Sequence, residues 1–339
     1  MEGIWSKPFG VSVTGLSHKR RGIDCEDAFT TQVSADGNWI ALCVSDGAGQ
    51  AKFGGESSKI ISNEFSKRLI NIAEKINKSG TGSWINDAIL ESVIEIRKIL
   101  QSTAGNNDLS EYSATLVACL IGSIGGISVH IGDGAVLAGK IDETDINQLT
   151  LDSEYFLSAP ENQEYANQTY FITDQKWIKH IRIQTFPKAD WFMLATDGGC
   201  ALALNRYLKP NPNFIIPLFE SLIRSTDNDS EIILQTLVED PNFEKLTDDD
   251  KTILILMSGH LKNFSDHQLK LSESQVNLDD LTHNNFDESA SIVNKKQSKI
   301  GLITQYLTRM RSMPNWLIFI QLILLLIIVT WQFVIIIEG

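Results

Sequence analysis

The chain has 339 residues, of which 43% are hydrophobic and 21% are charged, and its formal net charge is -13 at pH 7. This length and composition are typical of a globular protein with a sizeable core, folded as one large domain or two ordinary ones. The acidic balance argues against a protein that binds nucleic acid through the phosphate backbone, because such binding needs clustered Lys and Arg.

The cysteines are spread widely, without a C-x-x-C pair, and three of them lie within or beside apolar runs. This pattern predicts small buried residues in a reducing compartment, in place of a disulfide framework or a zinc site. The first ten residues, MEGIWSKPFG, lack a basic start followed by an apolar core, so no secretory signal is predicted. The four cysteines are Cys25, Cys43, Cys119 and Cys200.

The N-terminal region begins with a weakly alternating run at residues 10–16, GVSVTGL, which predicts a strand. The polar segment 17–29 follows and contains the adjacent carboxylates Glu26 and Asp27. Adjacent side chains on a strand point to opposite faces, so one of the pair can bind a metal while the other supports it or lies at the surface. A charged turn is the alternative interpretation.

The run WIALCVSDGAG, residues 39–49, predicts a buried strand that ends at Asp46 and Gly47. A carboxylate in this position is well placed to hold a divalent cation through oxygen. Residues 191–199, WFMLATDGG, show the same pattern and predict a second buried strand that ends at Asp197. Each Asp-Gly corner alone is most simply a turn, and the two corners together suggest one metal site.

Apolar residues recur at helical spacing in four segments. Two long helices are predicted at residues 57–77 and 83–101, and their apolar stripes are predicted to face the core. Shorter amphipathic helices are predicted at residues 214–224 and 230–238. These stripes account for core packing, so we assign no chemistry to them.

The middle of the chain contains strand-like runs at residues 112–122, 127–131 and 136–141, joined by short turns that contain glycine. This spacing predicts a β-meander whose middle turn places Asp133 at a strand end. The long polar segment 142–177 predicts a surface excursion near the substrate approach. The last strand of the globular region is predicted at 252–257, directly after a run of three aspartates.

The C-terminal region has a different composition. Asn, Ser, Asp and Gln dominate residues 263–298, and a flexible polar linker is predicted at residues 261–314. Residues 316–337 contain no charged side chain, and a helix of this length extends about 33 Å at ~1.5 Å per residue, enough to cross a bilayer. Basic residues precede this segment, whereas only Glu338 and Gly339 follow it, so the globular part is predicted to face the cytoplasm.

These observations predict a domain organisation of three parts. A globular domain is expected at residues 1–260, the linker at 261–314 and a single transmembrane helix at 315–337. Membrane lipid would therefore be a partner of the C-terminal helix. Strands joined by short turns, with helices between groups of strands, indicate an α+β fold built on antiparallel sheets.

Four separated acidic positions stand beside apolar strands, and their hard oxygen ligands suit Mg²⁺ or Mn²⁺. Two such cations bridged by a carboxylate and a water generate a hydroxide near neutral pH and hold a phosphoryl group for in-line attack. The four positions are Glu26–Asp27, Asp46, Asp197 and Asp249.

The ordered motifs GLSHKRRGIDCEDAF, VSDGAG, YSATLV, HIGDGAV, ATDGG and DDDKTILIL resemble the metal-dependent, type 2C serine/threonine protein phosphatase family in its bacterial-type branch. The resemblance extends over residues 10–257. It implies a four-layer αββα sandwich of antiparallel β-sheets flanked by helices, with metals held at one end. It also implies two Mn²⁺ or Mg²⁺ ions and a third that binds weakly.

By position in the family's motifs, Asp46 matches the carboxylate that bridges the two metals. Gly47 matches a residue that offers its backbone carbonyl. Glu26 matches a ligand of one metal, and Asp27 matches a residue that supports this ligand from behind.

The resemblance also implies that Asp197 and Asp249 hold the other metal and that Asp133 holds the third, weaker one. Asp249 is preferred to Asp250 because it stands four residues before Ile253, as in the family's pattern, and a slip by one residue stays open. The bridging aspartate and the two ligands of the other metal are the expected catalytic residues.

One position departs from the family. Many eukaryotic members place an arginine four residues before the glutamate to bind the substrate phosphate, and this chain has Gly22 there. His18, Lys19, Arg20 and Arg21 are candidates to replace it, since each offers charge-assisted donors. A solvated basic turn is the alternative.

The resemblance implies a tail-anchored enzyme that hydrolyses phosphoserine and phosphothreonine through a metal-bridging hydroxide, without a phosphoenzyme. A phosphorylated protein is the implied substrate, an opposing Ser/Thr kinase is an implied partner, and nucleic acid is not. The alternative is a catalytically weak or inactive scaffold that binds a kinase or phosphoprotein at the membrane. All the main carboxylates are present, which favours the enzyme.

Overall fold

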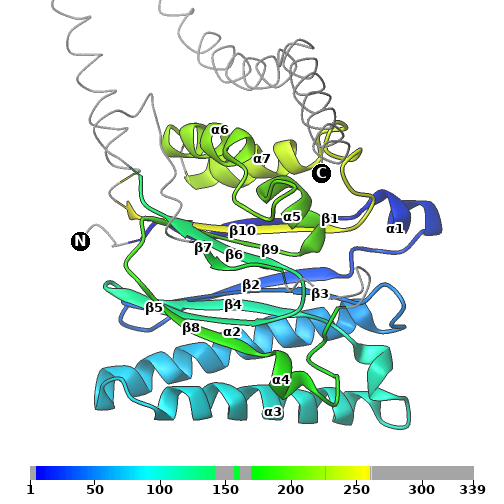
Figure 1. Ribbon diagram of the computed structural model, residues 1–339, viewed down its shortest axis with the longest axis vertical. Coiled ribbons are helices and arrows are strands. Elements are labelled where there is room, and N and C mark those ends of the chain that lie inside the picture. The colour runs from blue at the N-terminus through cyan, green and yellow to red at the C-terminus, as the bar shows by residue number, and fades with distance from the viewer. Residues whose placement is uncertain (1–4, 142–155, 161–168, 226, 260, 262–339) are drawn as a thin grey trace, which may run out of the picture. The chain divides into compact units, whose positions relative to one another are not determined.

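The fold is seen in a computed structural model, which describes residues 5–141, 156–160, 169–225, 227–259 and 261. The chain divides into two compact units, Met1–Gln275 and Val276–Gly339, and every described residue belongs to the first. In this unit two β-sheets lie face to face and helices cover their outer faces (Figure 1).

All the strand pairs in both sheets are antiparallel in the described part of the chain. One sheet consists, in spatial order, of β1 (Phe9–Val13), β10 (Lys251–Met257), β9 (Trp191–Ala195), β6 (Ala135–Gly139) and β7 (Phe156–Ser158). The other consists of β2 (Asp27–Val33), β3 (Ile40–Asp46), β4 (Leu116–Ile121), β5 (Gly125–Ile131) and β8 (Arg182–Pro187).

The helices form the outer layers, which confirms the predicted antiparallel sheets flanked by helices (Figure 1). The second sheet is covered by α2 (Gly54–Ser79) and α3 (Trp84–Ala104), with the short η1 (Leu109–Tyr112) and α4 (Trp177–His180) beside them. The first sheet is covered by α5 (Asp197–Ala203), α6 (Pro212–Ile223) and α7 (Asp227–Val238). The helix α1 (Leu16–Arg21) lies at one end of the sandwich.

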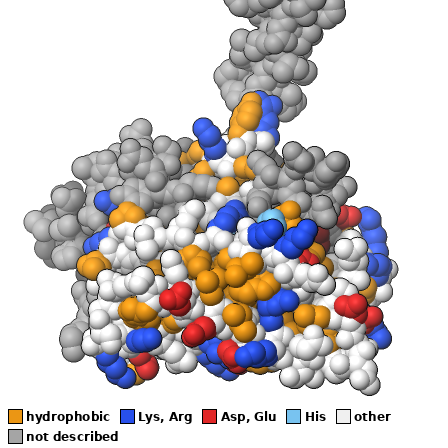
Figure 2. Space-filling model, turned by 60° about the horizontal axis from the view of Figure 1, so that its bottom comes forward, with side chains coloured by type: hydrophobic (Ala, Val, Ile, Leu, Met, Phe, Trp, Pro, Cys, Tyr) orange, Lys and Arg blue, Asp and Glu red, His pale blue; other side chains and the backbone are white. Residues whose placement is uncertain are grey.

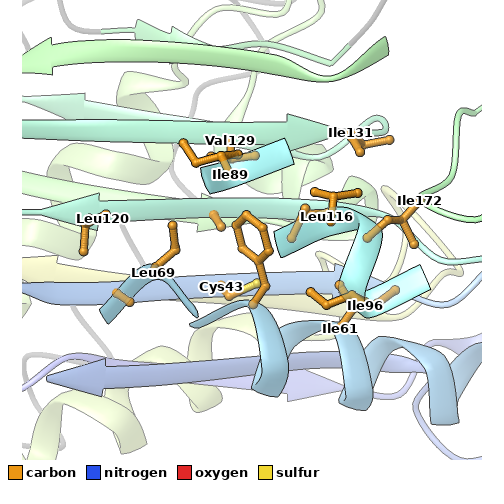
Figure 3. Packing of buried hydrophobic residues seen from close by; sticks show 14 of the residues in the cluster. Cys43, Ile61, Leu69, Ile89, Ile96, Leu116, Leu120, Val129, Ile131 and Ile172 are labelled. Atoms are coloured by element: carbon orange, nitrogen blue, oxygen red, sulfur yellow. The ribbon is translucent and has the colours of Figure 1, made fainter. Parts of the chain in front are cut away.

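Strand β3 supplies side chains to two apolar layers at once. Its residues Ala41 and Cys43 face the helices, where they join a cluster that includes Phe65 of α2 (Figure 3). Its residues Leu42 and Val44 point the other way, into the layer between the two sheets. Because side chains alternate along a strand, a strand buried on both faces needs a nearly continuous apolar run. The buried exception in β3, Ser45, donates its hydroxyl to the Thr115 carbonyl.

The predicted β-meander is wrong. Strands β4 and β5 pair as expected, but β6 pairs with β9 in the other sheet. The chain crosses between the sheets through a tight Gly132-Asp133-Gly134 connection. Gly132 has a φ of 121°, and a Cβ at Gly134 would lie 2.5 Å from the carbonyl oxygen of Ala195. A side chain would clash at this close crossing, so glycine is needed there. A glycine-containing segment that is typical of a hairpin turn can therefore also connect two different sheets.

Several elements of the described chain, α1, α5 and β8 among them, are absent from the sequence patterns. The segment predicted as a polar strand or turn contains α1, whose six residues LSHKRR have no apolar stripe. The second Asp-Gly corner is itself the start of α5, whose first residue is Asp197, so the strand before it ends earlier than predicted, at Ala195. Strand β8 is an edge strand with exposed side chains and weak alternation. Of the predicted excursion at 142–177, residues 142–155 and 161–168 lie outside the described residues.

The predicted anchor at 315–337 lies outside the described residues, as does the linker apart from Leu261. Among the helices of the described part, none is both long and apolar enough to cross a membrane. Figure 2 shows a face of the molecule on which hydrophobic side chains lie among scattered charges. Ile94 of α3 and Ile178 of α4 are exposed, at 41% and 57%.

Candidate active site

Strand pairing gathers acidic residues at one end of the sandwich. Asp27 begins β2 and Asp46 ends β3, and these two residues are direct partners in the antiparallel register. In the other sheet Ala135, the first residue of β6, pairs with Ala195, the last residue of β9. Asp133 precedes Ala135 and Asp197 follows Ala195, so both aspartates lie at this end of the sheet. The topology therefore brings together four carboxylates that lie far apart in the sequence.

The aspartates before β10 reach the same end, because Ile253 also pairs with Ala195. Asp249 is exposed, whereas Asp250 is buried, at 2% exposure. Both oxygens of Asp250 accept hydrogen bonds from the backbone, from Gly15 at 2.7 Å and from Glu26 at 2.6 Å. Of the two aspartates, Asp249 is therefore the one whose carboxylate is accessible to an ion. This agrees with the preference for Asp249 from the family's motif, and its role as a metal ligand stays a prediction.

Asp46 is the centre of the acidic cluster. Burial raises its pKa well above the ordinary value, and the nearby carboxylates of Asp27, Asp197, Asp133 and Asp249 raise it further. A negative charge disfavours ionisation of its neighbours in a site that is screened from water. Its backbone is held firmly, since the Asp46 N–H donates to the hydroxyl of Thr115 at 3.0 Å.

The neighbouring aspartates show the same effect. Burial raises the pKa of Asp197 to about 8, and the charges of Asp133 and Asp249 contribute to the shift. Burial raises the pKa of Asp27 to about 7, although the hydrogen bond from Thr196 opposes the shift. The pKa of Asp133 is also raised, again chiefly by burial.

The donor set fits divalent cations. Asp27 Oδ1 and Asp133 Oδ1 are buried and have no hydrogen-bond partner among the described residues. Buried carboxylates that repel one another are stabilised by a positive charge, and their oxygen atoms suit Mg²⁺ or Mn²⁺. Within the described ranges no three His, Cys, Asp or Glu side chains are arranged to hold one ion. Charge and donor type thus fit such cations, and the ligand set and the number of ions stay predictions.

Gly47 and Glu26 form the junction between β3, α2 and the segment before β2. The Gly47 N–H donates to the Glu26 carbonyl at 3.2 Å. A Cβ at Gly47 would lie 2.3 Å from the carbonyl carbon of Gly54, so the start of α2 approaches this backbone directly. Glycine is required here for close packing, which explains the Asp-Gly corner in physical terms.

The basic residues of α1 fall into two groups. Arg20 and Arg21 are exposed, and Arg21 lies near enough to Glu26 to lower its pKa against the stronger, opposite effect of burial. Lys19 forms an ion pair with Glu244 at 3.2 Å. His18 is only 3% exposed and lies against two carboxylates, so its surroundings differ from those of a surface phosphate-binding residue.

Threonine hydroxyls contact the cluster without having been predicted to do so. Thr196 donates its hydroxyl to Asp27 Oδ2 at 2.7 Å, and Thr169 donates its hydroxyl to Asp133 Oδ2. Thr196 stands next to a predicted ligand, which is a usable sequence signal. Thr169 lies 36 residues from its partner, so only the folded chain reveals the contact.

All four cysteines have free thiols, and three of them are buried. Cys25, which precedes Glu26, has a pKa raised by burial and by the negative charges of Asp27 and Asp250. A thiol must lose its proton to act as a nucleophile, so this environment opposes thiolate chemistry.

Comparison with known proteins identifies relatives of this chain. A family model described as "Protein phosphatase 2C" matches residues 14–239. Serine/threonine-protein phosphatase 3 of Escherichia coli (strain K12) is 28% identical over 263 residues, which cover 73% of this chain and 96% of that protein.

Solved structures share the fold. A bacterial serine phosphatase matches with a TM-score of 0.50 and 16% identity, over 74% of this chain and 97% of that one. The S. agalactiae serine/threonine phosphatase matches with a TM-score of 0.51 and 12% identity, over 74% and 99% of the two chains. A C. elegans sex determining protein matches with a TM-score of 0.52 and 13% identity, over 78% and 68%. At these identities the likeness is one of fold.

Proposed function

Because the chain belongs to the protein phosphatase 2C family and is a protein serine/threonine phosphatase, we propose that divalent cations at the acidic end of its sandwich support the hydrolysis of phosphoserine and phosphothreonine. One observation carries this proposal. Asp46 lies half-buried at the end of β3, opposite Asp27 in the strand register, and the charges of four nearby carboxylates add to the effect of burial in raising its pKa. A cluster of this kind destabilises the fold unless positive charge balances it, so it indicates a functional site.

The residues that would hold the cations come from both sheets. When bound, two Mn²⁺ or Mg²⁺ ions would neutralise the carboxylates and the substrate phosphate and would lower the pKa of water. Hydrolysis then needs no group on the protein to accept the phosphate, in agreement with the raised pKa of the nearby thiol of Cys25. The proposed ligands are Glu26, Asp46, Gly47, Asp197 and Asp249, with Asp27 in support and Asp133 for a third, weaker ion.

Arg20 and Arg21 are the proposed contacts to the substrate phosphate. Both are exposed at the end of α1, and Arg21 lies near Glu26. A guanidinium in this position can donate two hydrogen bonds to phosphate oxygens. We expect the change of either arginine to alanine to raise the KM for a phosphopeptide more than it lowers kcat. Lys19→Ala is the matched control, because Lys19 is already paired with Glu244.

Hydrolysis of a phosphothreonine peptide by the full chain, with and without Mn²⁺, tests the metal-dependent reaction. We expect Mn²⁺-dependent release of phosphate that falls by more than about 100-fold in Asp197→Asn, since loss of even an outer partner of a metal ligand lowers activity by ~10–100-fold. Asp87→Asn, an exposed change on α3, is the control and should leave activity unchanged. Metal-independent hydrolysis that survives Asp197→Asn would exclude this reaction scheme.

Membrane anchoring is the second part of the proposal. The 22 uncharged residues from 316 to 337, preceded by a polar linker and basic residues, support a C-terminal anchor and a catalytic domain that faces the cytoplasm. We expect the full chain to resist extraction from membranes by alkaline carbonate. The double change Leu324→Arg and Leu325→Arg adds about 3 kcal/mol per arginine to insertion and should release the protein with its activity intact. Soluble behaviour of the unchanged chain would refute the anchor.

A phosphoprotein is the proposed substrate, and a Ser/Thr kinase that produces it is the proposed counterpart. Phosphothreonine and phosphoserine esters arise only by phosphoryl transfer to a hydroxyl, so the reaction that supplies this substrate must be a kinase reaction. The relative from Escherichia coli, whose name is that of a serine/threonine-protein phosphatase, supports this substrate class.

A further inference from the structure

His18 is the buried residue of α1, and its ring lies between two carboxylates (α1 in Figure 1). Its Nδ1 atom is 2.8 Å from Asp250 Oδ2, and its Nε2 atom is 3.5 Å from Glu26 Oε2. Burying an imidazole is unfavourable unless its polar atoms have partners. The ring is therefore held by Asp250 on one side and borders a proposed metal ligand on the other.

Asp250 is suited to fix the ring. It is 2% exposed, and besides His18 it accepts the backbone N–H groups of Gly15 and Glu26. Gly15 is the residue directly before α1, so the same carboxylate holds the start of the helix and the ring that the helix carries. Charge-assisted hydrogen bonds of this kind are strong and directional.

The backbone of Glu26 is fixed independently of His18. Its N–H binds Asp250, and its carbonyl accepts from Gly47 N at 3.2 Å and from Ser58 Oγ at 2.5 Å. A Cβ at Gly55 would lie 3.2 Å from Glu26 Cα, so α2 also confines the start of this side chain. The Glu26 carboxylate itself lies beside the backbone N–H of Gly55 and His18 Nε2, and of these two neighbours His18 is the one that comes from a side chain.

We propose that His18 is a positioning residue that holds the Glu26 carboxylate toward a divalent cation, with Asp250 holding the ring in place. The inference rests on the proposed function, because it requires a cation at Glu26. Side chains behind metal ligands orient them, and their loss typically weakens metal binding by ~10–100-fold. His18 thereby acts on the metal site through Glu26 and has no direct contact with the substrate.

Two substitutions separate the two contacts of the ring. The amide nitrogen of an asparagine can take the place of Nδ1, so His18→Asn keeps the bond to Asp250 and loses the contact with Glu26. The amide nitrogen of a glutamine can reach the position of Nε2, so His18→Gln keeps the contact with Glu26. Mn²⁺ affinity of the full chain is measured by titration calorimetry, and thermal unfolding of the metal-free variants is measured beside it.

We expect the Mn²⁺ Kd of His18→Asn to rise at least about 10-fold, and that of His18→Gln to stay within ~3-fold of the unchanged chain. In a Glu26→Gln background, His18→Asn should add no further loss, because the histidine acts through the glutamate. Equal Mn²⁺ affinity in His18→Asn and the unchanged chain would overturn the inference while the proposed function stands. An unchanged chain that binds no Mn²⁺ would overturn the proposed function itself.

Failure to fold is also decisive. If metal-free His18→Asn is unfolded, the Mn²⁺ affinity is measured instead in His18→Gln, with and without Glu26→Gln. A loss of affinity in His18→Gln that is additive with Glu26→Gln would show that His18 serves the fold alone and would overturn the inference.

Discussion

Asp27 offers a direct test of the electrostatics at the acidic end of the sandwich. Its side chain is 4% exposed, and burial raises its pKa to about 7, with the hydrogen bond from Thr196 opposing part of the shift. In the unfolded chain an aspartate has a pKa of about 4. Between these two values the folded protein keeps a proton on Asp27 that the unfolded chain has released.

The sign of the pH dependence follows from this difference. Where the folded state binds more protons than the unfolded state, stability falls as pH rises, by about 1.4 kcal/mol per pH unit for one group. Asp27 should therefore destabilise the metal-free protein progressively from pH 5 to pH 7, and no further once it is ionised. Two pH units correspond to a loss of about 3 kcal/mol between pH 5 and pH 8.

Urea unfolding of the full chain, kept metal-free with a chelator, measures this loss at pH 5 and pH 8. In Asp27→Asn the difference in unfolding free energy between the two pH values should shrink by about 3 kcal/mol, because the titrating group is gone. Asp36→Asn is the matched control, since Asp36 is an exposed aspartate whose pKa is lowered to about 2, chiefly by its hydrogen bond from Ser34. If the difference in unfolding free energy between pH 5 and pH 8 is as large in Asp27→Asn as in the unchanged chain, Asp27 is already ionised in the folded protein at pH 5, and the prediction is wrong.

Two further predictions concern the framework around the site. Asp250→Ala leaves the backbone N–H groups of Gly15 and Glu26 and the His18 ring without their partner. It should lower the unfolding free energy, measured by urea unfolding, by about 3–9 kcal/mol at ~1–3 kcal/mol per lost partner; a loss below about 1 kcal/mol would contradict the bonding pattern. Gly47→Ala places a Cβ 2.3 Å from backbone of α2 and should destabilise the protein by several kcal/mol in thermal unfolding, whereas Gly49→Ala, with open space around it, should not. Equal effects of the two glycine changes would refute the close approach.

The strand ends are the part of the site that the sequence specifies most directly. An apolar run that stops before an acidic residue marks a buried strand and its approximate end. Strand β3 ends at Asp46 as predicted, whereas β9 ends at Ala195, shortly before Asp197. The reason is local, since burial on both faces forces continuous apolar residues and the first acidic residue must lie at the rim. The long helices are equally local, because their apolar spacing repeats over several turns.

The change of sheet after β5 is a property that local patterns do not contain. A hairpin turn and a crossing between sheets use the same glycines, and pairing of β6 with β9 depends on a strand that lies more than fifty residues later. Helix α1 escapes prediction for a related reason. Its side chains are polar and basic, and the helix exists because Gly15 and His18 bind Asp250, more than two hundred residues away.

Asp249 and Asp250 show how the fold separates two residues that the sequence presents as equivalent. Both aspartates precede β10, and they differ in burial: Asp250 is 2% exposed, whereas Asp249 is exposed. Asp250 turns inward, where Gly15, Glu26 and His18 use both of its oxygens, and Asp249 is left exposed beside Asp46 and Asp197. The buried aspartate thus gives the site its geometry while the exposed one is available to an ion. The spacing of residues in the sequence does not distinguish these two aspartates, because their difference arises from contacts with residues near the other end of the chain.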